Sequence, residues 1–64
     1  MTYADNPAEL VTFPNGTVFR DANGDWGEID SHEGGSVAIV VFGSEIPCGA
    51  LCFSYPVLIV HIPE

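Results

Sequence analysis

The stretch Thr17-Val-Phe-Arg-Asp-Ala-Asn-Gly-Asp-Trp-Gly-Glu-Ile29 decides the fold of this chain. Its Asn-Gly dipeptide is typical of a tight hairpin turn, because both residues tolerate positive φ. Before the turn, polar and apolar residues alternate over Thr17–Asp21, which places Phe19 and Arg20 on opposite faces of a strand. The stretch therefore predicts two antiparallel strands joined by a tight turn, the second strand being Trp26–Ile29.

Further strands are predicted on both sides of this hairpin. Glu9–Phe13 is read as a strand that precedes a Pro14-Asn15-Gly16 turn, so that three strands form a meander. The apolar segments Ser36–Phe42 and Pro56–Ile62 are predicted to be strands, the first buried on both faces. The other segments are expected to be loops at Asp30–Gly35 and Gly43–Pro47, an irregular link or weak strand at Gly49–Phe53, and a short helical turn, if any, near Pro7–Leu10 or Cys48–Cys52.

The length of 64 residues predicts a single domain, residues 1–64, in which residues 1–8 form an irregular N-terminal arm. Five or six short strands with tight turns indicate an all-β fold. We expect a small antiparallel barrel or a rolled sheet of SH3-like size. A chain this short buries only about 60% of its unfolded surface, so oligomerisation would help to stabilise it.

The charge is strongly negative, with nine carboxylates against one cation and a net charge of −8. This charge argues against binding to nucleic acid and to anionic membranes, because both require Lys and Arg. It permits imitation of nucleic acid in a basic groove, or it keeps a hydrophobic chain soluble. We expect an acidic interaction surface formed by Asp21, Asp25, Trp26, Glu28, Asp30 and Glu33.

Within this surface, Arg20 is expected to form a cross-strand ion pair with Asp25 or Glu28. Trp26 is either a core residue or an anchor of an interface.

Apolar residues make up 47% of the chain, more than so small a protein can bury, which predicts a homo-oligomer or a partner interface. The expected apolar contact face consists of Val57, Ile59 and Ile62. The longest apolar runs have six residues, whereas a membrane-spanning helix needs about 20. Because Met1–Asp5 also lacks the pattern of a signal peptide, we expect a protein that stays in the cytoplasm.

No catalytic, cofactor or metal site is predicted. Asp21-x-Asn23-x-Asp25 resembles the start of a calcium loop, but Trp26 and His32 stand where such a loop needs Gly and Glu. The carboxylates of turn residues explain the pattern equally well. The chain also lacks the glycine elbow or oxyanion signature that nucleophilic catalysis would require.

The cysteines, Cys48 and Cys52, are four residues apart. In a reducing compartment they would be free apolar thiols, and a local disulfide between them is the alternative. His32 and His61 do not complete a zinc-binding pattern with them.

Residues Gly16 through Asp25 resemble a phrase found in small uncharacterised proteins of actinobacterial phages and their hosts, roughly Gly-Thr-Val-aromatic-Arg-Asp-x-x-Gly-Asp-x-Trp. Here Trp26 comes one residue early, and the last third of the chain has no counterpart. The resemblance implies a compact phage-encoded β protein, and it transfers no functional residue.

Together these observations favour a non-enzymatic, phage-type accessory protein that acts by protein–protein contact. The expected function is a host-directed binder or inhibitor in the host cytoplasm. The alternatives are a virion component, such as a capsid decoration protein on a repeating lattice, and an acidic mimic of nucleic acid.

Overall fold

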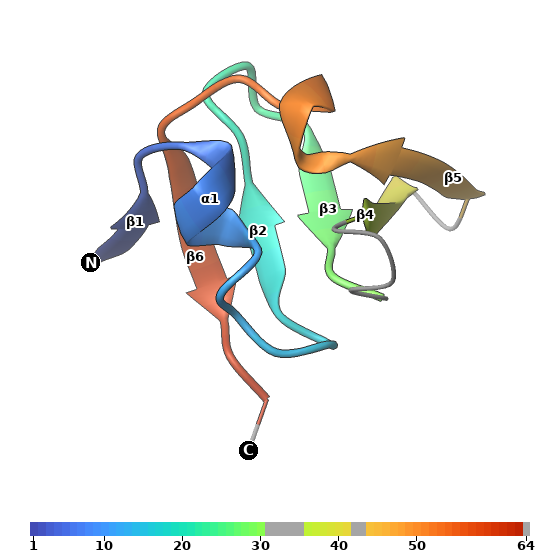
Figure 1. Ribbon diagram of the computed structural model, residues 1–64, viewed down its shortest axis with the longest axis horizontal. Helices are drawn as coiled ribbons and strands as arrows, with labels where there is room; N and C mark the ends of the chain where they lie inside the picture. Colours follow the sequence, from blue (N-terminus) through green and yellow to red (C-terminus); the bar gives the residue numbers. More distant parts are fainter. Residues whose placement is uncertain (31–35, 42–43, 64) are drawn as a thin grey trace.

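A computed structural model shows a small, mostly strand protein built on a four-stranded antiparallel sheet (Figure 1). The structure describes residues 1–30, 36–41 and 44–63, with the backbone alone over residues 36–41 and 44–48. The all-β prediction is confirmed. In spatial order, the sheet contains β1 (Thr2–Ala4), β6 (Val57–His61), β2 (Val18–Arg20) and β3 (Trp26–Glu28). A second sheet pairs β4 (Ser36–Val41) with β5 (Ser44–Gly49). The described residues also contain two short helical turns, α1 (Pro7–Leu10) and η2 (Ala50–Cys52).

The hairpin that the sequence predicts is present. In β2 and β3, Arg20 lies opposite Trp26 and Val18 lies opposite Glu28. The turn between them is closed by an Asp21 N–H that donates to the Asp25 carbonyl at 2.8 Å. Gly24 in this turn has φ +90°, a left-handed conformation that glycine adopts at little cost.

The predicted meander is wrong in its first strand. Residues Pro7–Leu10 form α1, because Asn6 caps the helix and Pro7 occupies its first turn. The Asn6 side chain accepts the N–H of Glu9 at 3.0 Å, and the Glu9 carboxylate accepts the N–H of Asp5 at 2.9 Å. Because of this capping, Glu9 and Leu10 belong to a helical turn and not to a strand.

The N-terminal arm, predicted to be irregular, contributes strand β1. Its partner is β6, whose Leu58 lies opposite Tyr3 on one side and opposite Arg20 of β2 on the other. The last strand in the sequence is therefore an inner strand of the sheet, between the first strand and the hairpin.

The remaining segments agree in part with prediction. One short helical turn at most was predicted, at either of two places, and the structure has a turn at each of them, α1 and η2. The expected loop Gly43–Pro47 overlaps strand β5. The loop predicted over Asp30–Gly35 lies outside the described residues from position 31 onward. The burial predicted for the side chains of β4 also concerns atoms outside the described part of the chain.

The sheet does not close into a barrel, which corrects that part of the expectation. Strands β4 and β5 pair with each other in a separate two-stranded sheet that packs beside β3, so the ladder of the larger sheet ends there. Figure 1 shows α1 in front of the larger sheet and η2 at the start of the segment that leads into β6.

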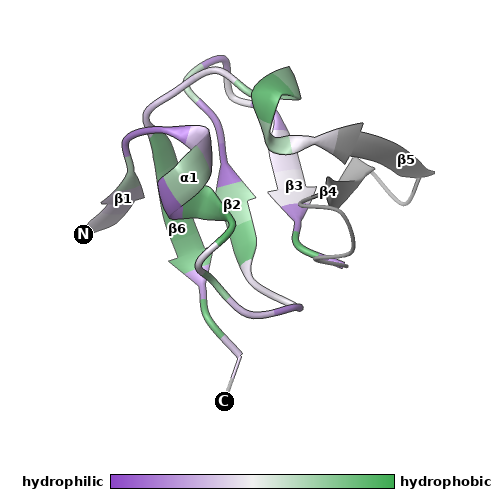
Figure 2. Ribbon diagram, viewed as in Figure 1, coloured by the Kyte–Doolittle hydropathy of each residue, from purple (hydrophilic) through white to green (hydrophobic). Residues whose placement is uncertain are grey.

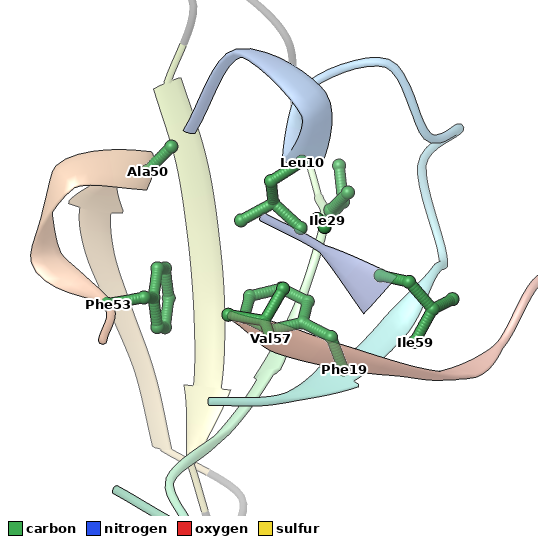
Figure 3. Close-up of a cluster of buried hydrophobic side chains, with 8 residues drawn as sticks. Leu10, Phe19, Ile29, Ala50, Phe53, Val57 and Ile59 are labelled. Carbon is green, nitrogen blue, oxygen red and sulfur yellow. The ribbon is translucent and has the colours of Figure 1, made fainter. Parts of the chain in front are cut away.

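The core lies between this sheet and the two helical turns (Figure 3). The Phe19 and Phe53 rings meet edge to face, with centroids 4.7 Å apart and planes at 83°. Figure 2 shows that hydrophobic residues gather along β6 and η2, which border this core. Its buried members are Ala4, Leu10, Phe19, Ile29, Ala50, Phe53, Val57 and Ile59.

Val57 and Ile59 therefore point inward, at 0% and 8% exposure. The prediction that they belong to an exposed contact face is wrong, because side chains alternate along β6 and these two lie on the side that α1 and η2 cover. We call this side of the sheet the inner face.

Candidate functional site

The opposite side of the sheet carries a row of four side chains, one from each strand. The registers place Tyr3 opposite Leu58, Leu58 opposite Arg20, and Arg20 opposite Trp26. Directly opposed residues in antiparallel strands lie on the same side of a sheet. We call the side that carries Tyr3, Leu58, Arg20 and Trp26 the outer face.

The outer face is accessible to solvent. Tyr3 is 49% exposed and Trp26 is 37% exposed, whereas Leu58 is half-buried and Arg20 is exposed. Of the alternatives for Trp26, a core position is excluded by this exposure. The row therefore presents two aromatic rings, one aliphatic side chain and a guanidinium group across the full width of the sheet.

Arg20 is held in place by two contacts. Its guanidinium carbon lies 5.6 Å from the centroid of the Trp26 ring, which is a cation–π arrangement. Its Nε–H donates to the Gly24 carbonyl at 3.2 Å. The expected ion pair with Asp25 or Glu28 is absent from the described residues, because the register places Trp26 and not a carboxylate opposite Arg20.

A groove of about 500 Å³ opens beside this row. Tyr3 and Leu58 line it from β1 and β6, Pro56 from the segment before β6, and Arg20 from β2. The turn residues 21–24 also line it. Its volume falls within the range of about 300–1,000 Å³ typical of ligand-binding clefts.

Asp21, one of the residues that line this groove, stabilises the fold. Its side chain is 8% exposed, and its carboxylate accepts the backbone N–H groups of Asn23, Asp25 and Ser54 at 2.9, 2.9 and 3.1 Å. Ala22 N–H donates to the Ser54 carbonyl at 2.9 Å, and the Asn23 amide donates to the Ser54 hydroxyl at 2.6 Å. Asp21 thus ties the hairpin turn to the segment that leads into β6.

The pKa of Tyr55, next to this segment, is raised to about 12, first by burial and second by the negative charge of Asp21. Its hydroxyl donates to the Ala50 carbonyl at 2.6 Å. Because a phenol that stays protonated keeps this hydrogen bond, Tyr55 links η2 to the segment before β6 rather than acting as an acid or base.

The other predicted interaction residues differ in exposure. Asp25 and Asp30 are exposed, and Glu28 is half-buried on β3, on the outer face. Ile62 is 45% exposed beyond the end of β6. Glu33 lies outside the described residues.

The expectation of free thiols is wrong at Cys52, which is disulfide-bonded. The side chain of Cys48 lies outside the described part of the chain. Over residues 1–30, 36–41 and 44–63, no group of three or more His, Cys, Asp or Glu side chains is arranged to hold a metal ion.

Comparisons with protein-family models, with curated proteins and with solved structures gave no significant match. Among the described residues, we found no helix with the length and apolar character needed to cross a membrane.

Sequence reasoning missed Tyr3 and Leu58 as surface residues. The signal for Leu58 was available, because strict alternation from a buried Val57 places Leu58 outward. The signal for Tyr3 was not, since three residues at a chain end do not establish a strand.

Proposed function

We propose that this chain is a non-enzymatic, phage-type accessory protein that binds a protein of the host through the outer face of its sheet. The observation that carries the proposal is the row Tyr3, Leu58, Arg20 and Trp26 beside an open groove. Aromatic residues and Arg are the residue types most enriched at the energetic centres of protein interfaces.

The charge of the chain supports a basic partner. Asp25, which directly precedes Trp26, is exposed, as is Asp30, and the whole chain carries a net charge of −8. Such a charge accelerates association with a basic surface by electrostatic steering, and it does so less as salt is added. Asp21 is not part of this surface, because backbone N–H groups occupy its carboxylate.

The size of the outer face supports a small contact element on the partner. Four strands about 4.8 Å apart give a face about 15–20 Å wide. Because each strand has only three to five residues, the area of this face is small beside the roughly 800 Å² per partner of a standard interface. A short segment of the partner fits this area better than a second folded domain.

The proposal is tested by capture from host lysate on three immobilised proteins. These are the wild type, a Tyr3→Ala/Trp26→Ala double variant, and a Leu51→Ser control that changes an 86% exposed residue on η2. We expect one protein to be retained by the wild type and the control and lost by the double variant. It should elute earlier as salt rises, and Asp25→Lys should weaken its retention. Equal retention by all three proteins would contradict a role for the outer face.

A virion component remains the second candidate, and one observation favours it. Leu51, Val60 and Ile62 are 86%, 47% and 45% exposed and give the chain apolar contact points outside the row. A subunit of a repeating lattice, or of a homo-oligomer, needs more than one contact. Mass spectrometry of purified virions that detects the chain at a fixed ratio to the capsid protein would establish this role.

A further inference from the structure

We infer that the groove on the outer face binds a proline-rich segment of the partner in the polyproline II conformation, with a basic residue at one end. The inference rests on the proposed function and names the chemistry of the partner. It follows from the spacing of the row, from the hydrogen-bonding groups left free in the groove, and from the charges around it.

The spacing of the row matches a polyproline II helix. Tyr3 and Arg20 lie two strands apart, on either side of Leu58, which corresponds to about 9.6 Å at the usual strand spacing. One turn of a polyproline II helix has three residues and advances about 9.3 Å. A segment that crosses the strands would therefore place residues i and i+3 in equivalent positions beside Tyr3 and Arg20.

The surfaces of the groove suit proline rings. Tyr3 offers an aromatic face, and Leu58 and Pro56 offer aliphatic ones. Trp26 continues the row beyond Arg20. Proline-rich ligands characteristically dock into grooves lined by aromatic side chains, since their backbone is already ordered and loses little entropy on binding.

The free polar groups that β1 and β2 present to the groove, those of Tyr3 and Arg20, are mainly hydrogen-bond donors, and the Asn23 amide oxygen is an acceptor in the turn. Arg20 has five N–H donors, of which only Nε–H is used within the described residues. The Tyr3 hydroxyl donates to the Met1 sulfur at 3.6 Å, a weak acceptor that a carbonyl oxygen can replace. The one carboxylate of the groove, that of Asp21, already accepts three N–H groups.

A donor-rich groove selects a segment that offers carbonyls and few N–H groups. A polyproline II helix has no internal hydrogen bonds, so its carbonyls are free, and proline has no N–H. A partner strand would bring N–H groups that need acceptors, and the carbonyls of a partner helix are satisfied within the helix.

The charges exclude the other ligand that a free guanidinium suggests, namely a carboxylate. Arg20 is the only Lys or Arg in a chain of net charge −8, and Asp21 and Asp25 flank it in the turn. An anion would be repelled by this surrounding charge, whereas a neutral carbonyl is not. Glu28, on the outer face two residues beyond Trp26, and the exposed Asp25 favour a basic residue at one end of the segment.

Peptide titration tests the inference, with fluorescence of Trp26 as the readout because it is the only tryptophan in the chain. The probes are an acetylated and amidated peptide with two prolines three residues apart and a terminal Arg, the same peptide with both prolines replaced by Ala, and the same peptide with Arg replaced by Glu. A fourth peptide ends in Leu with a free carboxylate. We expect saturable binding of the first, and at least about tenfold weaker binding of the others.

Variants of the chain show where the peptide binds. Arg20→Met removes the donors and keeps an aliphatic stem, and Tyr3→Ala removes one aromatic wall. Each should weaken the first peptide by at least about tenfold, while Leu51→Ser binds it like the wild type. Circular dichroism checks that each variant is folded. If Tyr3→Ala does not fold, Arg20→Met still tests the inference.

Two results would overturn the inference. One is tighter binding of the free carboxylate peptide than of the proline peptide, which would make Arg20 an anion site. The other is equal binding of the proline and alanine peptides. In either case, a host protein still captured through the outer face would leave the proposed function standing with a different ligand chemistry.

Discussion

The inner and outer faces of the four-stranded sheet come from the same strands and have opposite chemistry. On the inner face, Phe19 and Val57 are fully buried. On the outer face, the neighbouring residues Arg20 and Leu58 form a row with Tyr3 and Trp26 that solvent reaches. Each strand thus supplies both stability and a contact surface, one residue apart, and the two roles should be separable by substitution.

The sharpest test of this separation compares two aromatic residues. Phe19→Ala should destabilise the fold by about 3–5 kcal/mol, close to the whole stability of a domain this small. Trp26→Ala should cost about 1 kcal/mol, because it removes chiefly a cation–π contact at an accessible site. Thermal and urea unfolding followed by circular dichroism measures both. Equal losses would mean that the outer face belongs to the core.

The second largest effect is expected at Asp21, which lines the groove but serves the fold. Asp21→Ala leaves three backbone N–H groups without their acceptor and should cost about 3 kcal/mol. The matched control is Asp25→Ala in the same turn, which removes an exposed carboxylate and should change stability by less than about 0.5 kcal/mol. Urea unfolding of both variants measures the two losses. An Asp21→Ala variant as stable as the wild type would show that the link to Ser54 is dispensable.

A smaller effect is expected at Gly24, where the turn meets the outer face. Its φ is +90°, and an added Cβ would lie 3.3 Å from Arg20 Nη2. Gly24→Ala should therefore cost about 1–2 kcal/mol and shift Trp26 emission as Arg20 moves. Gly49→Ala is the control, because φ is −74° and no atom lies within 4 Å of the new Cβ. If both variants melt at the wild-type temperature, the turn does not hold Arg20.

The smallest effect is invisible at neutral pH and concerns Tyr55, which packs against the core from the inner face. Its pKa is raised from 10.0 to about 12 in the folded chain. The associated stability is complete below about pH 10 and is lost as pH rises from about 10 to about 12, because the unfolded chain releases this proton first. The wild type should therefore lose more stability over this range than Tyr55→Phe does. Parallel losses in the two proteins, measured by urea unfolding at several pH values, would contradict the burial of this hydroxyl.

Local rules predicted the hairpin well. The Asn23-Gly24 turn and the alternation of Phe19 and Arg20 depend on residues that are neighbours in the chain, and the structure confirms both. The same kind of rule would have found α1, since Asn6, Pro7 and Glu9 form a helix-capping pattern, but the β-favouring residues that follow pointed to a strand.

The candidate site was predicted only in part. Trp26 was named as a possible interface anchor, and its 37% exposure is consistent with that role. Val57 and Ile59 were placed on the wrong face, because a continuous apolar run does not reveal which of its alternating residues point inward. Asp21 was assigned to an acidic surface, because no pattern in the neighbouring sequence predicts its hydrogen bond with the N–H of Ser54, 33 residues away.

The sequence by itself thus determined the turn at Gly24, the in-and-out alternation of β2 and the excess of negative charge. These properties depend on backbone sterics and on composition, which act over a few residues or over the whole chain at once. Only the tertiary structure decided that β6 lies between β1 and β2, and with this placement that Tyr3, Leu58, Arg20 and Trp26 share one row. The physical reason is that strand pairing between distant segments is chosen by the burial of Phe19, Val57 and Ile59 together. The outer row follows from that shared burial and leaves no pattern in any single segment.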